Sequence, residues 1–317
     1  MTATALTVAV CAGTAFTGLA PAQAAPTAGR TIPTGYSPLT VAVAPNGSTA
    51  YVVNSASSTL SVIDVASDAV VATINVGVRP TAVAFSRDGA KAYVTDSNTR
   101  TVSVINVSTR VVVGAITVAS GSYGVAFSPT SDKAYVTNHE SASVSVIQVS
   151  TDSVIGSIPV GNSPLWVAFS KDGSKAGVTN SADNTVSGIN PNTDKVVVTI
   201  PVGNYPAGGS FSPDGTKAYV ANYASQSVSV INVSTRKVVA TIPVGHYLWA
   251  LAFSPDGTKA YVTNYESASV SVIRVSTDTV IGTVPAGGGP AGVAFTPNGT
   301  KAYVANYWET NVTVINS

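Results

Sequence analysis

The chain has 317 residues, of which 45% are hydrophobic and only 10% are charged. Its 16 basic and 15 acidic residues give a formal net charge of +1, which excludes bulk electrostatic attraction to nucleic acid or to an anionic membrane surface. The single cysteine, Cys11, lies in a segment that we expect to be removed. Disulfides, thiol catalysis and cysteine metal sites are therefore excluded for the rest of the chain.

The N-terminal segment has the pattern of a secretory signal. Residues 6–20 are small and apolar, and Ala22-Gln23-Ala24 matches a small-x-small cleavage site. We expect residues 1–24 to be a signal peptide and the protein to be secreted or extracytoplasmic, at the cell surface or in the periplasm. The segment differs from a typical signal peptide in one respect: it lacks a positively charged start, because no Lys or Arg precedes Arg30. The apolar run is short and Pro21 closes it, which favours a cleaved signal over membrane insertion.

The remaining chain repeats one pattern every 42 residues. The marker position is held by Tyr51, Tyr93, Tyr135, Gly177, Tyr219, Tyr261 and Tyr303. In the sixth copy, residues 250–254, 259–264, 269–275 and 279–285 are rich in Val, Ile, Tyr and Thr and largely alternate in character, as half-buried antiparallel strands do. Repeats of about 40–45 residues with four strands are typical of propeller blades. We predict an all-β, seven-bladed β-propeller with four-stranded antiparallel blades.

The ends of the repeat region predict how the ring closes. The chain stops at Ser317, after the third strand of the seventh copy, and Thr31-Ile32-Pro33 is in phase with the fourth-strand sequence Thr241-Ile242-Pro243. We expect a 3+1 closure in which residues about 28–33 supply the outer strand of the last blade. Residues 25–317 would then form a single propeller domain.

The connections divide into two classes. Turns between the first and second strands and between the third and fourth strands barely change, as in Asp214-Gly215 and Asp256-Gly257, and we call their side the turn face. Loops between the second and third strands, and the crossovers between blades, differ in almost every copy, and we call their side the variable face. The individual chemistry of this protein is expected on the variable face.

The repeat is recognisable. Tyr-Val-Thr-Asn at 135–138 and 261–264, following Ser-Pro-Asp-Gly-Thr-Lys-Ala at 254–260, resembles the YVTN repeat of bacterial and archaeal seven-bladed propellers over about residues 31–317. That family includes surface-layer and periplasmic propellers and is related to lactonase-type propellers. Its roles are heterogeneous, so the resemblance implies a fold much more than a function.

Aromatic residues concentrate on the variable face, mostly in copies five to seven. We expect a patch around the channel mouth that binds a small molecule, a glycan or a protein on a monomeric propeller. The candidate ligand-binding residues are Tyr123, Trp166, Tyr205, Tyr223, His246, Tyr247, Trp249, Tyr265, Tyr307 and Trp308. Two alternatives stay open: Tyr223, Tyr265 and Tyr307 share one repeat position and could simply pack between loops. Trp166 could fill the space left by Gly177 and Gly188 or project into the channel mouth.

The charged residues of this face argue against nucleic acid as a partner. They are Arg79, Asp96, Arg100, Glu140, Asp183, Glu266 and Glu309, and five acids against two bases give about −3. Nucleic-acid binding needs the opposite sign.

The alternative function is a lactonase- or lyase-type enzyme with its site at the channel mouth near His246. Acid–base chemistry needs a titratable pair near the axis, and the candidate catalytic residues are His246, His139, Arg79, Glu140 and Glu266. His139 and His246 fall in copies nearly opposite across the ring, and neither belongs to a His-x-His or His-Glu-x-x-His pair. We expect no metal site and no cofactor.

Overall fold

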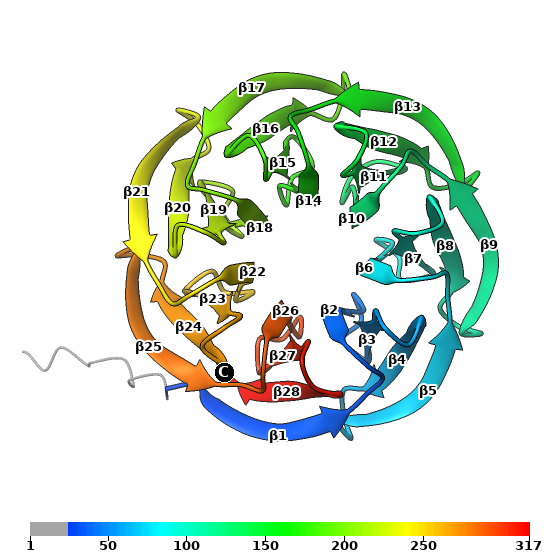
Figure 1. The fold of residues 1–317 in the computed structure, drawn as a ribbon, viewed down its shortest axis with the longest axis horizontal. Helices are drawn as coiled ribbons and strands as arrows, with labels where there is room; N and C mark the ends of the chain where they lie inside the picture. Colours follow the sequence, from blue (N-terminus) through cyan, green and yellow to red (C-terminus); the bar gives the residue numbers. More distant parts are fainter. Residues whose placement is uncertain (1–24) are drawn as a thin grey trace, which may run out of the picture.

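Seven four-stranded antiparallel sheets surround a central axis in the computed structural model, which describes residues 25–317 (Figure 1). The predicted all-β, seven-bladed propeller is confirmed. None of the elements in this range is an apolar helix that could cross a membrane. The predicted signal segment, residues 1–24, lies outside the described residues.

Each blade runs outward from the axis in chain order. The innermost strands are β2 (Pro38–Val43), β6 (Pro80–Phe85), β10 (Ser122–Phe127), β14 (Pro164–Phe169), β18 (Pro206–Phe211), β22 (Leu248–Phe253) and β26 (Pro290–Phe295). The second strands are β3 (Thr49–Asn54), β7 (Lys91–Asp96), β11 (Lys133–Asn138), β15 (Ala176–Asn180), β19 (Lys217–Asn222), β23 (Lys259–Asn264) and β27 (Lys301–Asn306). The third strands are β4 (Thr59–Asp64), β8 (Thr101–Asn106), β12 (Ser143–Gln148), β16 (Thr185–Asn190), β20 (Ser227–Asn232), β24 (Ser269–Arg274) and β28 (Asn311–Asn316). The outer strands are β5 (Ala69–Asn75), β9 (Val111–Thr117), β13 (Ser153–Pro159), β17 (Lys195–Pro201), β21 (Lys237–Pro243), β25 (Thr279–Pro285) and β1 (Thr27–Pro33).

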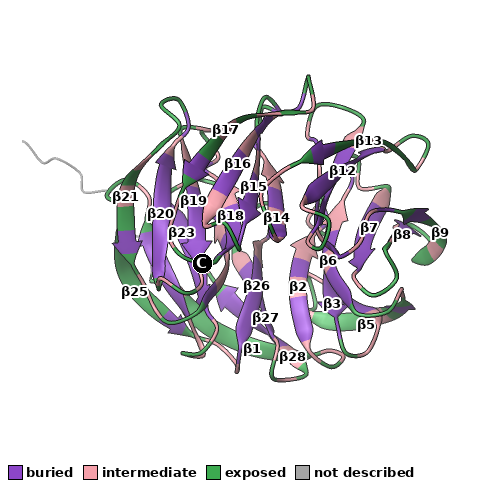
Figure 2. Ribbon diagram, turned by 45° about the horizontal axis from the view of Figure 1, so that its top comes forward, coloured by how far each residue is buried: buried purple, intermediate pink, exposed green. Residues whose placement is uncertain are grey.

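The hydrophobic core lies between neighbouring blades. Second and third strands such as β7 and β8 are buried along almost their whole length, whereas the outer strand β9 buries only Ile116 (Figure 2). The hydrophobic clusters combine side chains of adjacent blades, as where Val104 of blade two packs in one cluster with Val136 of blade three. A blade is therefore stable only against its neighbours, because both faces of its sheet are apolar.

A ring contact recurs at five of the blade junctions. The tyrosine of a second strand packs on a phenylalanine of the next innermost strand, with centroids 4.6 Å apart for Tyr93 and Phe127 and 4.5 Å apart for Tyr261 and Phe295. The other three pairs, at 4.7–4.8 Å, are Tyr51–Phe85, Tyr135–Phe169 and Tyr219–Phe253. Such tilted pairs contribute about 0.5–1.5 kcal/mol beyond their buried area.

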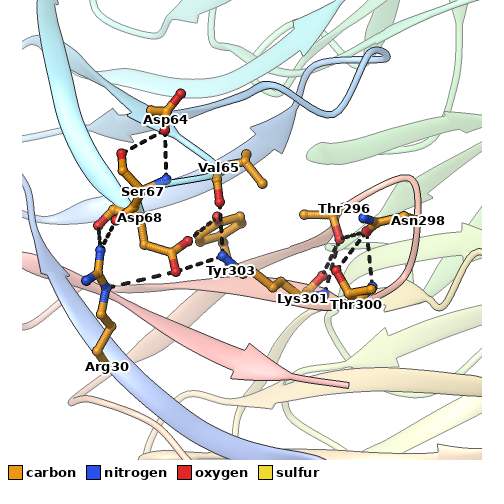
Figure 3. A network of polar contacts seen from close by, with 10 residues as sticks. All are labelled: Arg30, Asp64, Val65, Ser67, Asp68, Thr296, Asn298, Thr300, Lys301 and Tyr303. Carbon is orange, nitrogen blue, oxygen red and sulfur yellow. Dashed lines mark hydrogen bonds and ion pairs between the residues drawn. The ribbon is translucent and has the colours of Figure 1, made fainter.

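A second contact, which we call the polar lock, occurs at four junctions. In it, a Lys and a Tyr of one blade bind an Asp in the turn between the third and fourth strands of the next blade. Between blades seven and one, Lys301 Nζ lies 2.8 Å from Asp68 Oδ2, and the Tyr303 hydroxyl donates to Asp68 Oδ1 at 2.7 Å (Figure 3). Burial raises the pKa of Tyr303 and the bond to Asp68 raises it further, so the phenol keeps its proton and donates. The other locks are Lys91–Tyr93–Asp152, Lys133–Tyr135–Asp194 and Lys217–Tyr219–Asp278, with Lys–Asp distances of 2.6–2.7 Å.

The ring closes as predicted. β1 pairs antiparallel with β28 as the outer strand of the last blade, with Ile32 opposite Val312, and runs from Thr27 to Pro33 against the expected 28–33. The Arg30 guanidinium donates to the backbone carbonyls of Ser67 and Asp68 in blade one (Figure 3). The N-terminal strand therefore covers the edge of blade seven and also holds blade one.

Deleting residues 25–34 should lower the thermal stability markedly. The deletion exposes the edge of β28 and removes Ile32, whose side chain is only 2% exposed and contributes roughly 1.5–3 kcal/mol by burial alone. The melting temperature, followed by circular dichroism, should fall relative to a chain that starts at residue 25. Equal melting temperatures for the two chains would contradict this closure.

Candidate functional site

The central channel is narrow and has an aromatic wall at the variable face. Its cavity of about 140 Å³ is lined by residues of all seven innermost strands, with Tyr123, Trp166 and Trp249 as the aromatic members. Ligand pockets usually measure about 300–1,000 Å³. The channel therefore cannot enclose more than a very small molecule, and anything larger must lie on the face above it.

Trp166 belongs to this channel wall. Its ring lies against Gly209 of the next blade, where an added β-carbon would come within 3.4 Å of the indole. The cavity beside Gly177 is lined by other residues and stays open. The interpretation that Trp166 fills the space left by Gly177 and Gly188 is therefore wrong.

A continuous row of aromatic rings runs over blades five to seven on the variable face. We call it the aromatic arc: Tyr205, Tyr223, Tyr247, Trp249, Tyr265, Tyr307 and Trp308. Ring centroids lie 5.6 Å apart for Tyr205 and Tyr223, 5.9 Å for Tyr223 and Trp249, and 5.9 Å for Trp249 and Tyr265. Tyr247 adds to the row at 4.8 Å from Tyr223. Trp308 and Tyr307 complete it at 4.9 and 6.0 Å from Tyr265.

The arc has exposed rings supported by half-buried ones. Trp308 is 58% exposed, Tyr205 41% and Tyr247 38%, whereas Tyr223 and Tyr265 are partly covered by their neighbours. Tyr265 touches Trp249, Tyr307 and Trp308 at once. The packing alternative for Tyr223 and Tyr265 thus accounts for their ring contacts, and the same contacts hold the exposed rings in place.

Two residues of the arc, Tyr205 and Tyr247, have a left-handed backbone conformation, which is energetically unfavourable for residues other than glycine. The residue of each crossover just before the innermost strand is left-handed, with φ of 52° for Tyr205 and 53° for Tyr247, and Gly121 and Gly289 take left-handed conformations in two other crossovers. A non-glycine residue there costs roughly 1–2 kcal/mol. Ser37, Arg79 and Ser163 adopt the same conformation in three further crossovers, so this backbone geometry belongs to the repeat and is shared by residues outside the arc.

Tyr123 reaches the arc from blade three. Burial raises the pKa of Tyr123, and the neighbouring phenols of Tyr205 and Tyr307 raise it further. His139 lies next to Tyr123, with the two ring centroids 6.4 Å apart. The predicted ligand-binding residues are thus brought near one another around the channel mouth, with Trp166 in the channel wall and the exposed His246 beside Tyr247.

The candidate catalytic residues are spread around the ring. Arg79 precedes β6 in blade two, while His139 and Glu140 follow β11 in blade three (Figure 1). His246 precedes β22 and Glu266 follows β23, both in blade six on the opposite side of the ring. Glu140 accepts a hydrogen bond from Ser120 at 2.5 Å. Within residues 25–317 there is no group of three or more His, Cys, Asp or Glu placed to hold a metal ion.

Comparison with known proteins identifies the family. The family described as YNCE-like beta-propeller matches residues 32–214, more than half of the chain. This chain belongs to the YNCE-like β-propeller family. A chain of Kuenenia stuttgartiensis hydrazine synthase is similar to this YNCE-like propeller in structure, with a TM-score of 0.82 over 89% of this chain and 96% of that chain. The two are 23% identical, so the similarity shows the fold alone. A search of curated proteins finds no match.

One acid of the variable face in this YNCE-like propeller is buried. Asp96 takes the place of an asparagine, such as Asn138, whose Nδ2 donates to Ser143 and Ser145. Asp96 is 0% exposed and accepts a hydrogen bond from Ser103 at 2.7 Å. It lies under Gly77, where an added β-carbon would come within 2.3 Å of the carboxyl group. Asp96 therefore lies beneath the variable face, and the acids at its surface are Glu140, Asp183, Glu266 and Glu309.

Replacing Asp96 by Asn should stabilise this YNCE-like propeller at neutral pH. Burial raises the pKa of Asp96 from 3.8 to about 6, so the native state binds its proton more tightly than the unfolded chain does. Stability is then lost as the pH rises from about 4 through about 6. Asp96→Asn should raise the free energy of unfolding by roughly 1–3 kcal/mol above pH 6 and change it little near pH 4.

Denaturant unfolding at pH 4 and pH 8 measures this effect. Asn138→Asp is the matched control, because it should introduce the same pH dependence into blade three. An Asp96→Asn variant no more stable than the parent at pH 8 would contradict the argument.

Proposed function

We propose that this propeller is an extracytoplasmic, monomeric binding module that holds a protein partner on the aromatic arc. The observation that carries the proposal is the unbroken contact of seven rings, of which Tyr205, Tyr247 and Trp308 are well exposed. Tyrosine and tryptophan are the side chains that dominate protein-binding energetics, because they bury large rigid surfaces at little entropic cost. Exposed aromatic patches on this scale usually mark binding surfaces.

The ring orientations favour a protein segment with projecting side chains over a flat ligand such as a sugar or a planar metabolite. Interplanar angles range from 33° for Trp249 and Tyr265 to 79° for Tyr223 and Trp249. The rings thus present ridges and edges, between which the side chains of a protein segment can insert. A single flat platform for stacking a sugar or a planar metabolite would need near-parallel rings.

The charges beside the arc favour a basic segment. Glu266 and Glu309 follow Tyr265 and Trp308 directly in the loops of blades six and seven. Burial raises the pKa of Tyr223, and the neighbouring Tyr247, Tyr205 and negatively charged Glu266 raise it further, so Glu266 lies close to the arc. Glu309 accepts hydrogen bonds from the Gly288 backbone and the Asn311 amide at 2.7 and 2.6 Å, whereas Glu266 is exposed. Lysine or arginine side chains of the partner would pair with Glu266 and pack on the rings by cation–π contact.

The alternative, a lactonase- or lyase-type enzyme centred on His246, rests on the family relationship. Its candidate groups come from three different blades, and the channel beneath them holds only about 140 Å³. These observations support binding without chemistry as the function of this face.

A displayed peptide library selected on the immobilised propeller tests the proposal. Enriched peptides should carry Lys or Arg, and Trp308→Ala and Tyr247→Gly should each weaken their binding about tenfold or more, as expected for central aromatic contacts. Tyr247→Gly keeps the left-handed crossover, which tolerates glycine. Tyr36→Ala is the matched control, because Tyr36 is 69% exposed in the crossover into blade one, outside the arc.

Three results would count against this function. Binding that survives Trp308→Ala and Tyr247→Gly, or that falls equally in Tyr36→Ala, would show that the arc is not the site. Saturable binding on a glycan array with no peptide enrichment would replace the protein partner by a carbohydrate. Turnover of a lactone that is abolished by His246→Ala would favour the enzyme.

A further inference from the structure

The junction between blades four and five lacks both parts of the contact that the other junctions use. Gly177 stands where other blades have the tyrosine, and Arg236 stands where the locked junctions have the aspartate. The partners of these absent groups are still present, because Lys175 and Phe211 occupy their usual repeat positions. A phenylalanine face and a lysine ammonium group are thus left without the ring and the carboxylate that they bind elsewhere.

The space of the absent tyrosine remains open. A cavity of about 190 Å³ lies between the blades, lined by Gly177, Val186, Ile200, Phe211, Ile231 and Val233 among others. A β-carbon added to Gly177 would lie 3.7 Å from the Phe211 ring, at ordinary contact distance. Val198, opposite Gly188, occupies only the neighbouring position in the sheet. An engineered apolar cavity of about 150 Å³ binds benzene, so this cavity has room for one aromatic ring.

The opening of the cavity is positively charged. Lys175 and Arg236 both line it, at the turn face. Lys175 Nζ contacts Ser174 Oγ at 3.1 Å, and neither Lys175 nor Arg236 has a salt bridge within residues 25–317. The nearby Asp172 is engaged by Ser170 and Ser174, whose hydrogen bonds and, to a lesser degree, the charge of Lys175 lower its pKa to about 2. Two cations without a bound carboxylate therefore face an apolar slot.

We propose that this junction is a binding site for an aromatic monocarboxylate. The ring of the ligand takes the place of the absent tyrosine against Phe211, and its carboxylate takes the place of the absent aspartate beside Lys175 and Arg236. The other junctions supply the template, with ring centroids 4.5–4.8 Å apart and a lysine nitrogen 2.6–2.8 Å from the carboxylate. The site lies on the face opposite the aromatic arc and is independent of the function proposed there.

Calorimetric titration of the whole protein with benzoate, phenylacetate and 3-phenylpropanoate tests the proposal, since the three differ in the reach between ring and carboxylate. At least one should bind saturably with one site. Benzyl alcohol, which lacks the charge, and acetate, which lacks the ring, should bind about tenfold more weakly or not at all. No binding by any of the three acids, or acetate binding as well as they do, would overturn the proposal.

Variants at the junction separate the two halves of the site. Gly177→Tyr fills the cavity and should abolish binding. Arg236→Asp keeps the cavity but neutralises its opening, because the new aspartate pairs with Lys175 as in the locked junctions, and it should weaken carboxylate binding at least about tenfold. Tyr36→Ala, on the opposite face and outside the arc, is the matched control and should bind like the parent. Retained binding in Gly177→Tyr would place the ligand elsewhere.

The double variant Gly177→Tyr/Arg236→Asp should restore a complete ring contact and polar lock. We expect it to melt at a higher temperature than the parent and to bind none of the acids. Because the added side chain starts at ordinary contact distances, a folded protein is expected, and the melting curve itself checks this. A melting temperature below that of the parent would show that the cavity is not the place of the absent tyrosine.

Discussion

The structure depends on the packing of each blade against the next. Second and third strands such as β7 and β8 are buried and mostly apolar on both sides, so a single blade would expose two hydrophobic faces to water. The repeated solution places a tyrosine ring on the phenylalanine of the next blade and binds its hydroxyl to an aspartate. Because the ring is closed, each junction supports all the others, and the N-terminal strand β1 completes the last blade. The uniform turn face follows from this constraint.

Departures from the repeat show how a junction tolerates change. Between blades one and two, Thr49 replaces the lysine and Arg110 replaces the aspartate, so both members of the ion pair are lost together, and the Tyr51 hydroxyl stays buried with no hydrogen-bond partner in the described range. Between blades four and five, the aspartate and the tyrosine are lost while the lysine remains. The first change leaves one cation, Arg110, beside the Tyr51 ring, whereas the second leaves two cations, Lys175 and Arg236, beside an open ring position. The second arrangement is the one in which the ring position itself is empty, because Gly177 has no side chain to fill it.

The variable face is free of the constraint that fixes the turn face. Its loops contribute little to blade packing, so they can carry rings and charges that differ from copy to copy. The aromatic arc is confined to blades five to seven, where successive loops bring their rings within 4.8–6.0 Å of one another. Membership of the YNCE-like family and the similarity to a hydrazine synthase chain account for the ring of blades. They do not account for the arc, which belongs to loops grafted on that ring.

The sequence by itself determined the period of 42 residues, the strand pattern, the seven blades and the closure by the N-terminal strand, because each of these follows from local alternation and from phase along the chain. It also placed Tyr265 and Trp308 on one face with Trp249. Only the tertiary structure decided which of the residues that depart from the repeat lie next to one another. Gly177, Phe211 and Arg236 are far apart in sequence and come together only across a blade junction. The tertiary structure also buries Asp96 under Gly77 and places Trp166 in the channel wall. Both outcomes depend on packing against other parts of the ring, which cannot be predicted from the local sequence pattern.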